Sequence, residues 1–342
     1  MIDFRYHLVS LGAVFIALAV GIILGAGPLQ NSIGNVLSSQ VQALSEANSQ
    51  LKGDASKYKS TIAQHEAAWS DLAPELVQGT LTDRSIALVS LPGVSNDEIT
   101  AVSERLTEAG ASINMQVTLN SSWTAADQTA YRTTFASQLA TYIDGASEEM
   151  DANTLMTDAL YQLTVNGMAY SQNATLRDIL SGSDQPMMTI INATDAPAQA
   201  VVILSPDTDQ DDIDTRATKD PEVQAQATYD AQTYAALAAR MAGKVPTVVV
   251  GSADSPADAA RIVRDTDGTS TVDNVSDSLA VGTVNVVMAV ASELNDMTVH
   301  FGFDEGAQAA LSKRVESVKP AEAPAEQAPA QPAEEPAEQP AS

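Results

Sequence analysis

The chain has 342 residues, a formal net charge of −27 at pH 7 and no cysteine. Its acidity excludes nucleic acid as a partner, because the phosphates would be repelled, and the lack of thiols excludes disulfides, thiolate metal sites and cysteine nucleophiles. Once an apolar start and a biased tail are set aside, enough residues remain for one sizeable core.

The first feature along the chain is an apolar run, Leu8–Ala26, within a longer stretch that has no charged side chain. About 20 apolar residues cross a bilayer as a helix, whereas the apolar core of a signal peptide usually has about 7 to 15. We therefore expect residues 1–29 to be a retained anchor, with a cleaved signal peptide as the alternative. Because Arg5 precedes the run and the next basic residue is Lys52, the amino terminus is expected in the cytoplasm and the rest outside.

Small side chains recur every four residues along this run, at Ala13, Ala17, Gly21 and Gly25. Helices associate in lipid through close packing of such surfaces, since hydrophobicity supplies no drive there. The strip therefore predicts a helix–helix contact inside the membrane. Glycine and alanine are also common in membrane helices generally, so composition alone is the competing explanation.

Residues 30–78 follow a heptad pattern, with core positions alternately three and four residues apart. These seam positions are Leu37, Val41, Leu44, Asn48, Leu51, Ala55, Tyr58, Ile62, His65, Trp69, Leu72 and Leu76. We predict a coiled-coil stalk that ends near Pro74, in which Asn48 favours two-stranded pairing. His65 is interpreted as a packed seam residue rather than a metal ligand. The alternative is an amphipathic helix folded back onto the globular domain.

From residue 82 to residue 316, apolar strands alternate with helices. Strands are predicted at 85–91, 112–119, 200–204, 245–251, 271–275 and 298–301, and helices at 96–109, 125–143, 153–170, near 176, and at 227–242, 256–265 and 283–294. Continuously apolar strands between helices indicate a parallel sheet covered on both faces. We therefore predict an extracytoplasmic three-layer α/β domain of the doubly wound (Rossmann-like) type, with residues 125–181 as a helical insertion that forms a subdomain or cap.

Residues 317–342 are rich in proline, alanine and glutamate. Such a composition buries too little apolar surface to fold and stays extended. We predict a disordered tail that serves as a tether or spacer.

Three loops would form the ligand-binding edge of such a sheet, because they follow its apolar strands. They are Ser90–Gly93, Ser205–Asp207 and Gly251–Asp254, and none contains a G-x-G-x-x-G, a Walker lysine loop or a G-x-S-x-G elbow. Of the three histidines, only His300 lies in the predicted globular domain, so a Ser-His-Asp triad has one possible base. We predict that the chain is not an enzyme and assign no catalytic or cofactor-binding residue.

An acidic run follows the predicted strand at 200–204. Asp207, Asp209 and Asp211 imitate the opening of an EF-hand calcium loop, but Asp212 stands where that loop needs glycine. The position that needs a bidentate glutamate is also occupied by another residue type. A solvated loop between a strand and a helix is the favoured interpretation.

Soft-metal binding would depend on methionine, whose thioether suits Cu(I). Met187 and Met188 are adjacent, but neighbouring residues on a strand point to opposite faces and would not share one ion. Methionine as core filler is the favoured interpretation. No metal site is assigned, and Met187, Met188, His300 and the aspartates of the acidic run stand as the alternative ligands.

The amino-terminal stretch MIDFRYHLVSLGAVFIALAVGIILGAGPL resembles the opening of the mycobacterial copper transport protein B (MctB) family, known in corynebacteria as SteB. Further similarities lie in the heptads, in STVDNV at 270–275, and in Gly282 with the apolar helix Val284–Leu294. The resemblance covers most of residues 1–315 and implies an actinobacterial envelope protein. It implies either copper export or outer-membrane pore formation, or partnership with SteA, a membrane protein resembling thiamin pyrophosphokinase, in cell separation and control of peptidoglycan hydrolases.

We favour a non-enzymatic, single-pass envelope scaffold of the SteB type, because one span is too little to form a channel and no histidine cluster is available for copper. The small-residue strip and the seam would pair with a second copy, giving a homodimer, or with the helices of a SteA-like membrane partner. Copper transport is the alternative, with copper suggested by the family name only. A degenerate enzyme that binds a small ligand at the sheet edge is a third hypothesis.

Overall fold

The structure, a computed structural model, describes residues 4–315 except residues 148, 183–184 and 267; the side chains of residues 26–35 are not described. The predicted disordered tail, 317–342, therefore lies outside the described residues. The chain divides between His65 and Glu66 into two compact units.

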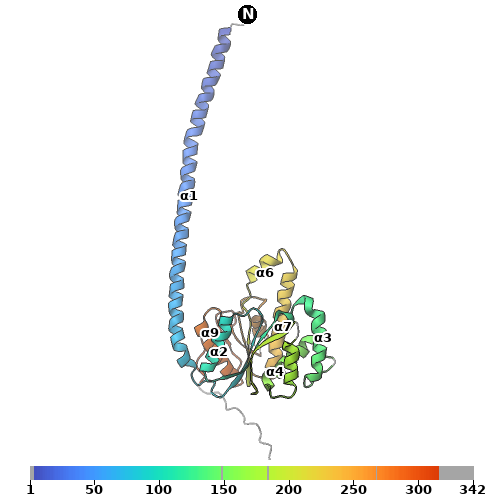
Figure 1. The fold of residues 1–342 in the computed structure, drawn as a ribbon. Coiled ribbons are helices and arrows are strands. Elements are labelled where there is room, and N and C mark those ends of the chain that lie inside the picture. The colour runs from blue at the N-terminus through green and yellow to red at the C-terminus, as the bar shows by residue number, and fades with distance from the viewer. Residues whose placement is uncertain (1–3, 148, 183–184, 267, 316–342) are drawn as a thin grey trace, which may run out of the picture. The chain divides into compact units, whose positions relative to one another are not determined.

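Helix α1 (Phe4–Val77) forms the first unit and contributes its last turns to the second (Figure 1). Its segment Phe4–Gly25 has a mean hydropathy of 2.6 and is long enough to cross a membrane. Helices of this kind near an amino terminus are found both as membrane anchors and as signal sequences. The helix ends at Val77, three residues after the predicted end at Pro74. Proline has no backbone N–H to donate, but its carbonyl can still accept the hydrogen bond of the following turn, so the helix continues past it. The amide of Gln78 donates to the carbonyl of Pro74 at 3.0 Å.

The second unit contains one seven-stranded sheet. Its strands are β1 (Ser85–Ser90), β2 (Ser112–Leu119), β3 (Met188–Ala193), β4 (Ala200–Leu204), β5 (Thr247–Val250), β6 (Ser270–Val272) and β7 (His300–Phe301). The strand order is β3-β2-β1-β4-β5-β6-β7, and every neighbouring pair is parallel except β2 with β3. The chain winds outward from β1 in one direction and from β4 in the other, so the predicted doubly wound fold is confirmed.

Strand β3 was absent from the predicted strands. It is an antiparallel edge strand whose residues are mostly half-buried or exposed, with Ile191 60 % exposed. An edge strand needs only one apolar face, and the polar Asn192 within it weakens the sequence signal. The five interior strands, β1, β2, β4, β5 and β6, all overlap predicted strands. Burial on both faces gives β1, β4 and β5 nearly continuous apolar runs, whereas β2 has an alternating pattern.

Nine α-helices and three short 3-10 turns are described. Besides α1, the helices are α2 (Asn96–Glu108), α3 (Thr129–Leu139), α4 (Ala152–Asn166), α5 (Asn173–Ser181), α6 (Gln210–Ala217), α7 (Glu222–Ala242), α8 (Ala259–Asp265) and α9 (Leu279–Glu293); the turns are η1 (Ser121–Trp123), η2 (Ala126–Gln128) and η3 (Ala140–Tyr142). Helix α6 was predicted only as a loop, because its eight residues are strongly polar and bury only Ile213.

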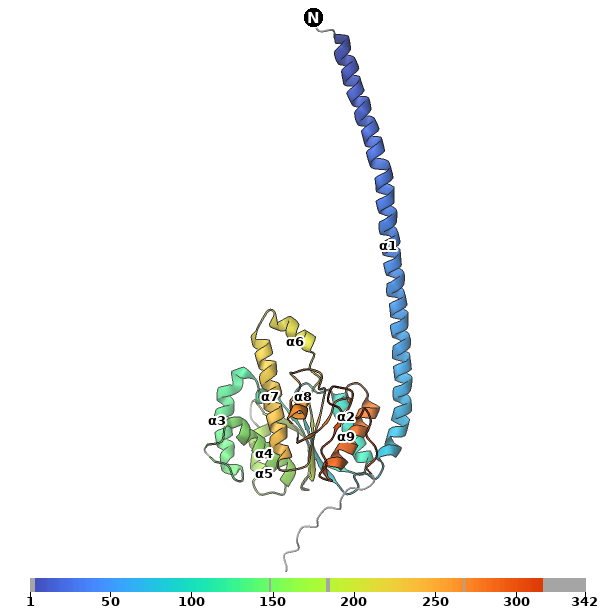
Figure 2. The ribbon, with the colours of Figure 1, turned by 180° about the vertical axis from the view of Figure 1, so that it is seen from behind.

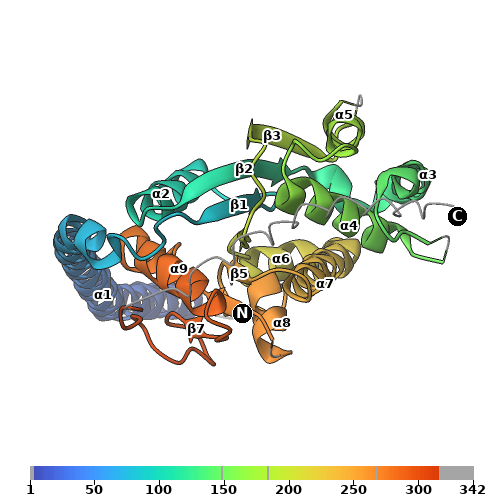
Figure 3. The ribbon, with the colours of Figure 1, turned by 90° about the horizontal axis from the view of Figure 1, so that it is seen from below.

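Helices cover both faces of the sheet. Figure 3 shows α2 and α9 on one face, and α4, α7 and α8 on the other. Alternate side chains of β1 serve the two faces: Ala87 and Val89 join the cluster under α4 and α7, while Ile86 and Leu88 join the cluster under α2 and α9. This alternation places one hydrophobic core on each side of the sheet and confirms the three predicted layers.

The helical insertion, residues 125–181, packs on the face that carries α7, as Figure 2 shows from behind. Phe135 of α3, Leu160 of α4 and Leu176 of α5 belong to the same buried cluster as Val117 and Ile203 of the sheet. The described residues of the insertion therefore extend the core of the α/β domain.

The last turns of α1 belong to the core on the opposite face. Ala73 and Val77 are fully buried there. The Glu66 carboxylate accepts hydrogen bonds from the Ser278 hydroxyl (2.6 Å) and the Ala280 amide (2.7 Å) at the amino terminus of α9. A negative charge is stabilising at this end of a helix, so Glu66 ties the last turns of α1 to the amino terminus of α9 within the second unit.

Candidate functional site

The three loops predicted at the carboxyl edge of the sheet lie next to one another. The Leu91 amide donates to the Leu204 carbonyl at 2.8 Å, and the Ser205 amide donates to the Val250 carbonyl at 2.6 Å. Gly251 has a φ of +153°, and a Cβ there would lie 2.6 Å from the Ser205 carbonyl oxygen. The close approach of the loops after β4 and β5 therefore requires glycine at this position.

Carboxylates gather at this edge. Burial raises the pKa of Asp207, and the negative charges of Asp254, Glu98 and Asp304 raise it further. Burial also raises the pKa of Asp304, which accepts a hydrogen bond from the Ala253 amide at 2.8 Å. The edge is thus strongly electronegative and favours cations over anions.

The predicted acidic run serves mainly to begin helix α6. Asp209 is the N-cap of this helix, and its carboxylate accepts from the Asp212 amide at 2.9 Å. Asp211 lies in the first turn of the helix. Asp207, Asp209, Asp211 and Asp254 all line one cavity of about 470 Å³. Among the described residues, no group of three or more His, Asp or Glu side chains is placed to hold a metal ion.

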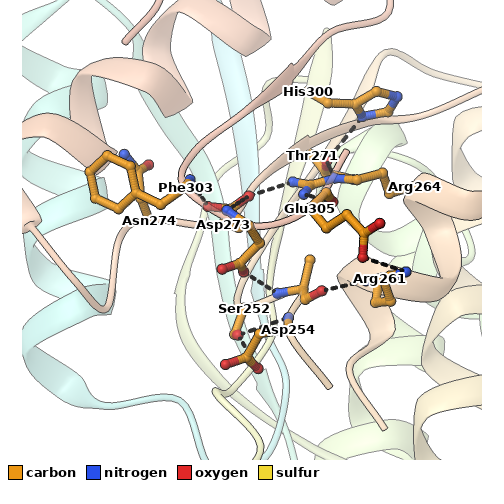
Figure 4. A network of polar contacts seen from close by, with 12 residues as sticks. Ser252, Asp254, Arg261, Arg264, Thr271, Asp273, Asn274, His300, Phe303 and Glu305 are labelled. Carbon is orange, nitrogen blue, oxygen red and sulfur yellow. Dashed lines mark hydrogen bonds and ion pairs between the residues drawn. The ribbon is translucent and has the colours of Figure 1, made fainter. Parts of the chain in front are cut away.

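A buried ion pair lies behind the edge (Figure 4). The Arg264 guanidinium donates to the Asp273 carboxylate at 2.8 Å and to the Thr271 hydroxyl at 2.9 Å. The side chains of Arg264 and Asp273 are only 3 % and 0 % exposed. Asp273 also accepts from the amides of Phe303 (2.6 Å) and Asp304 (3.3 Å). The pair therefore holds the loop after β7 against the end of β6.

The segment STVDNV is part of this internal framework. Asn274 is fully buried, and its amide oxygen accepts from Asn285 of α9 at 3.3 Å. A Cβ on Gly282 would lie 2.5 Å from the Cα of Val275. This segment and Gly282 thus position helix α9 against the turn after β6.

The copper-ligand candidates lie in the interior of the head. Met187 and Met188 are fully buried in the hydrophobic cluster under α4 and α7. His300 is 7 % exposed, and its Nδ1 lies 3.0 Å from the Thr271 hydroxyl. These positions fit core packing, which was the favoured interpretation of both methionines.

The strip and the seam on α1 are exposed in the single chain. No atom lies within 4 Å of a Cβ built on Gly21 or Gly25, and Ala13 and Ala17 are exposed. The large apolar seam residues from Leu37 to Ile62 are between 59 % and 72 % exposed. Asn48 is exposed as well, Trp69 is half-buried and Leu72 is 44 % exposed. The segment predicted as a stalk is thus helical, while its role as a stalk and its pairing stay predictions.

A cavity of about 560 Å³ opens beside the same sheet edge and was not predicted. Helix α7 supplies Gln226, Asp230 and Tyr234, which are four residues apart and so share one face of the helix. Their spacing was the available sequence signal. It was missed because the helix was predicted to begin at Ala227, which leaves Gln226 outside it.

The fold and these sites define a class of protein: an α/β head without an enzyme motif, preceded by a long helix whose first part is apolar enough for a membrane. A family model described as "Copper transport outer membrane protein, MctB" matches residues 1–312, so the chain belongs to the MctB family. This family is envelope-associated and is not a known enzyme family.

Similarity to curated relatives is more limited. The chain is 28 % identical over 127 residues to "Copper transporter MctB" of Mycobacterium tuberculosis (strain ATCC 25618 / H37Rv), a match that covers 37 % of this chain and 40 % of the relative. It is 29 % identical over 129 residues to the protein of the same name in Mycobacterium leprae (strain TN), covering 38 % of this chain and 41 % of the relative. The chain thus matches about two fifths of the length of these relatives.

Proposed function

We propose that this chain works in copper transport as a single-pass, membrane-anchored protein of the cell envelope. The observation that carries the proposal is the family match over residues 1–312, whose description names copper transport. The apolar helix Phe4–Gly25 is long enough to serve as the anchor. Since Arg5 lies at its start, the positive-inside tendency favours a cytoplasmic amino terminus and a head outside the plasma membrane.

The head supports an accessory role rather than that of the copper conduit. A single helix encloses no pore, and the sheet of the head has open edges that lipid would not tolerate. The candidate thioethers of Met187 and Met188 are buried, and the described part of the chain holds no cluster of metal-binding side chains. We therefore infer that the chain is non-enzymatic and assists a copper pathway whose conduit is a larger assembly.

The decisive experiment measures cellular copper by mass spectrometry in a strain that lacks the protein. We expect copper to rise severalfold, and we expect the full chain to reverse this rise. A chain without residues 4–25 should not reverse it, because it has no anchor. Unchanged copper in the deletion strain would overturn the copper proposal.

A Cu(I) titration of the full chain in detergent, under reducing conditions, tests the accessory role separately. We expect no binding tighter than micromolar. A tight stoichiometric site would show that this chain carries the metal itself.

The exposed seam on α1 favours a second candidate function, a SteB-like scaffold that works with a SteA-like membrane partner in cell separation. In the predicted heptad, Asp54 and Lys59 occupy flanking positions that face each other between two parallel copies of the helix. This charge pattern and the single Asn48 in the seam favour an in-register homodimer, and the same surface could take a partner helix.

Crosslinking identifies the partner, because a chain without cysteine gives a clean background. Cysteines at Leu44 and Leu51 should capture a second copy or a partner helix in cells, whereas a cysteine at Ser60, on the outer side of the same helix, should not. Gly21→Ile and Gly25→Ile should weaken the association if the small-residue strip is a contact surface. If Leu44 and Leu51 capture no more than Ser60, the pairing is wrong. Unseparated cells with normal copper in the deletion strain would favour the scaffold over copper transport.

A further inference from the structure

The 560 Å³ cavity lies where the strand order of the sheet reverses. It is lined by Pro92 after β1, by Thr124 after β2, by Pro206 and Thr208 after β4, and by helix α7. In doubly wound sheets, ligands bind in the crevice outside the carboxyl ends of the strands at this switch point. The volume is also within the range of about 300 to 1,000 Å³ that is usual for small-molecule sites.

The polar groups of the cavity are already held in place by one another. The Gln226 side-chain amide donates to the Thr124 carbonyl at 3.2 Å and to the Asp230 carboxylate at 2.5 Å. The Tyr234 hydroxyl lies 3.2 Å from the Thr124 hydroxyl, and both residues are buried. Asp230 is half-buried, so its carboxylate is oriented by the protein and partly shielded from water. A site arranged in this way loses little conformational entropy when a ligand binds.

The charge of the cavity favours one class of ligand. Asp127 and Asp230 line it, and the described lining residues include neither lysine nor arginine. The nearby Arg132 guanidinium donates instead to the carbonyls of Ser122 (3.3 Å) and Ala125 (2.5 Å). The charged groups described in the lining are therefore both carboxylates. An ammonium group would find a partly desolvated negative charge there, which the positive charge of the nearby Arg132 offsets only in part.

We propose that this cavity binds a cationic small molecule, whose protonated amine contacts Asp230 and whose hydroxyl or amide groups contact Thr124, Thr208 and Gln226. A second cavity of about 850 Å³ shares Ala126, Gln226, Ala227 and Asp230 with the first. The second cavity is lined by Arg216 as well as by Asp220, Glu222 and Asp230, so its charged groups are mostly acidic. A short chain of amine-bearing, hydroxylated units could therefore occupy both cavities and pass Asp230. This inference is independent of the role in copper transport.

The test is isothermal titration of the full chain in detergent with three sugar trimers of equal length. The trimer of glucosamine is cationic, that of N-acetylglucosamine is neutral and that of galacturonate is anionic. We expect one glucosamine trimer to bind per chain, at least tenfold more tightly than the neutral trimer, and no binding of the anionic trimer. Equal affinity for the cationic and neutral trimers, tightest binding of the anion, or no binding of the glucosamine trimer at millimolar concentration would overturn the proposal.

Matched variants distinguish this site from general attraction to an acidic protein. Asp230→Asn should lower the affinity for the glucosamine trimer at least tenfold, whereas Glu104→Gln on the exposed side of α2 should leave it unchanged. Ala227→Leu fills the shared wall of both cavities and should abolish binding, with Ala236→Leu on the exposed face of α7 as its control. Melting temperatures of all four variants report whether each one folds. An equal loss for Asp230→Asn and Glu104→Gln would show that the attraction is not specific to the cavity.

Discussion

Replacing Asp273 by asparagine should destabilise the head more than any exposed charge change. The substitution keeps the shape of the side chain but leaves the buried Arg264 guanidinium without its counter-charge. The two side chains are 0 % and 3 % exposed, and their atoms are 2.8 Å apart. Removing one partner of a buried ion pair costs about 3 to 5 kcal/mol. In a domain of this size, that loss lowers the melting temperature by roughly 6 to 20 °C.

The assay is urea unfolding of the full chain, followed by circular dichroism. Asp212→Asn is the matched control, because Asp212 pairs with Arg216 at 3.2 Å on the surface, with 55 % and 62 % of the side chains exposed. Such a pair contributes only about 0 to 1 kcal/mol. Arg264→Met combined with Asp273→Asn should cost less than the sum of the two single changes, because the sites are coupled. Equal losses for Asp273→Asn and Asp212→Asn would refute the reasoning.

Three further predictions concern the stability of the head and the stalk. Gly282→Val should prevent α9 from packing and lower the melting temperature strongly, because a Cβ there would lie 2.5 Å from the Val275 backbone. Gly53→Ala has open space around it and should stabilise α1 by about 1 kcal/mol. A lower melting temperature for Gly53→Ala than for Gly282→Val would contradict the packing at α9. Burial raises the pKa of Asp258 to about 6, so the wild type should gain stability relative to Asp258→Asn as the pH falls from 6 toward 4. Urea unfolding at several pH values measures this, and a difference in unfolding free energy that does not change with pH would refute it. Met187→Leu and Met188→Leu should each lower the free energy of unfolding by less than about 1.5 kcal/mol and leave cellular copper unchanged, because both thioethers are buried in the core. A rise in cellular copper in either variant would mean that these thioethers handle the metal.

The central strands could be predicted because burial on both faces of a sheet favours apolar residues. SIALVSL and AVVIL are such runs, and they became the central strands β1 and β4. The edge strand β3 and the polar helix α6 were missed for the converse reason. Each has one exposed side, and its identity depends on contacts with distant segments, as when Thr189 of β3 pairs with Thr118 of β2.

The candidate sites were predicted less completely than the fold. The three loops at the sheet edge follow from strand order alone, and they meet where expected. Asp230 could not be selected from the many acidic residues of the chain, because its half-burial depends on loops after β1, β2 and β4 that are far from it in sequence. His300 and the two methionines were candidates by chemistry, and their positions in or next to the edge strands β7 and β3 placed them in the interior.

Taken alone, the sequence determined the features that depend on local pattern. An apolar run of membrane length, a heptad repeat and strands of continuous apolar residues are short-range periodicities, and each limits the backbone wherever it occurs. The tertiary structure decided which side chains became buried partners and which lined a cavity, because burial and electrostatic coupling depend on distances between segments that are remote along the chain. Arg264 with Asp273, Glu66 at the start of α9, and Asp230 in its cavity are properties of that arrangement.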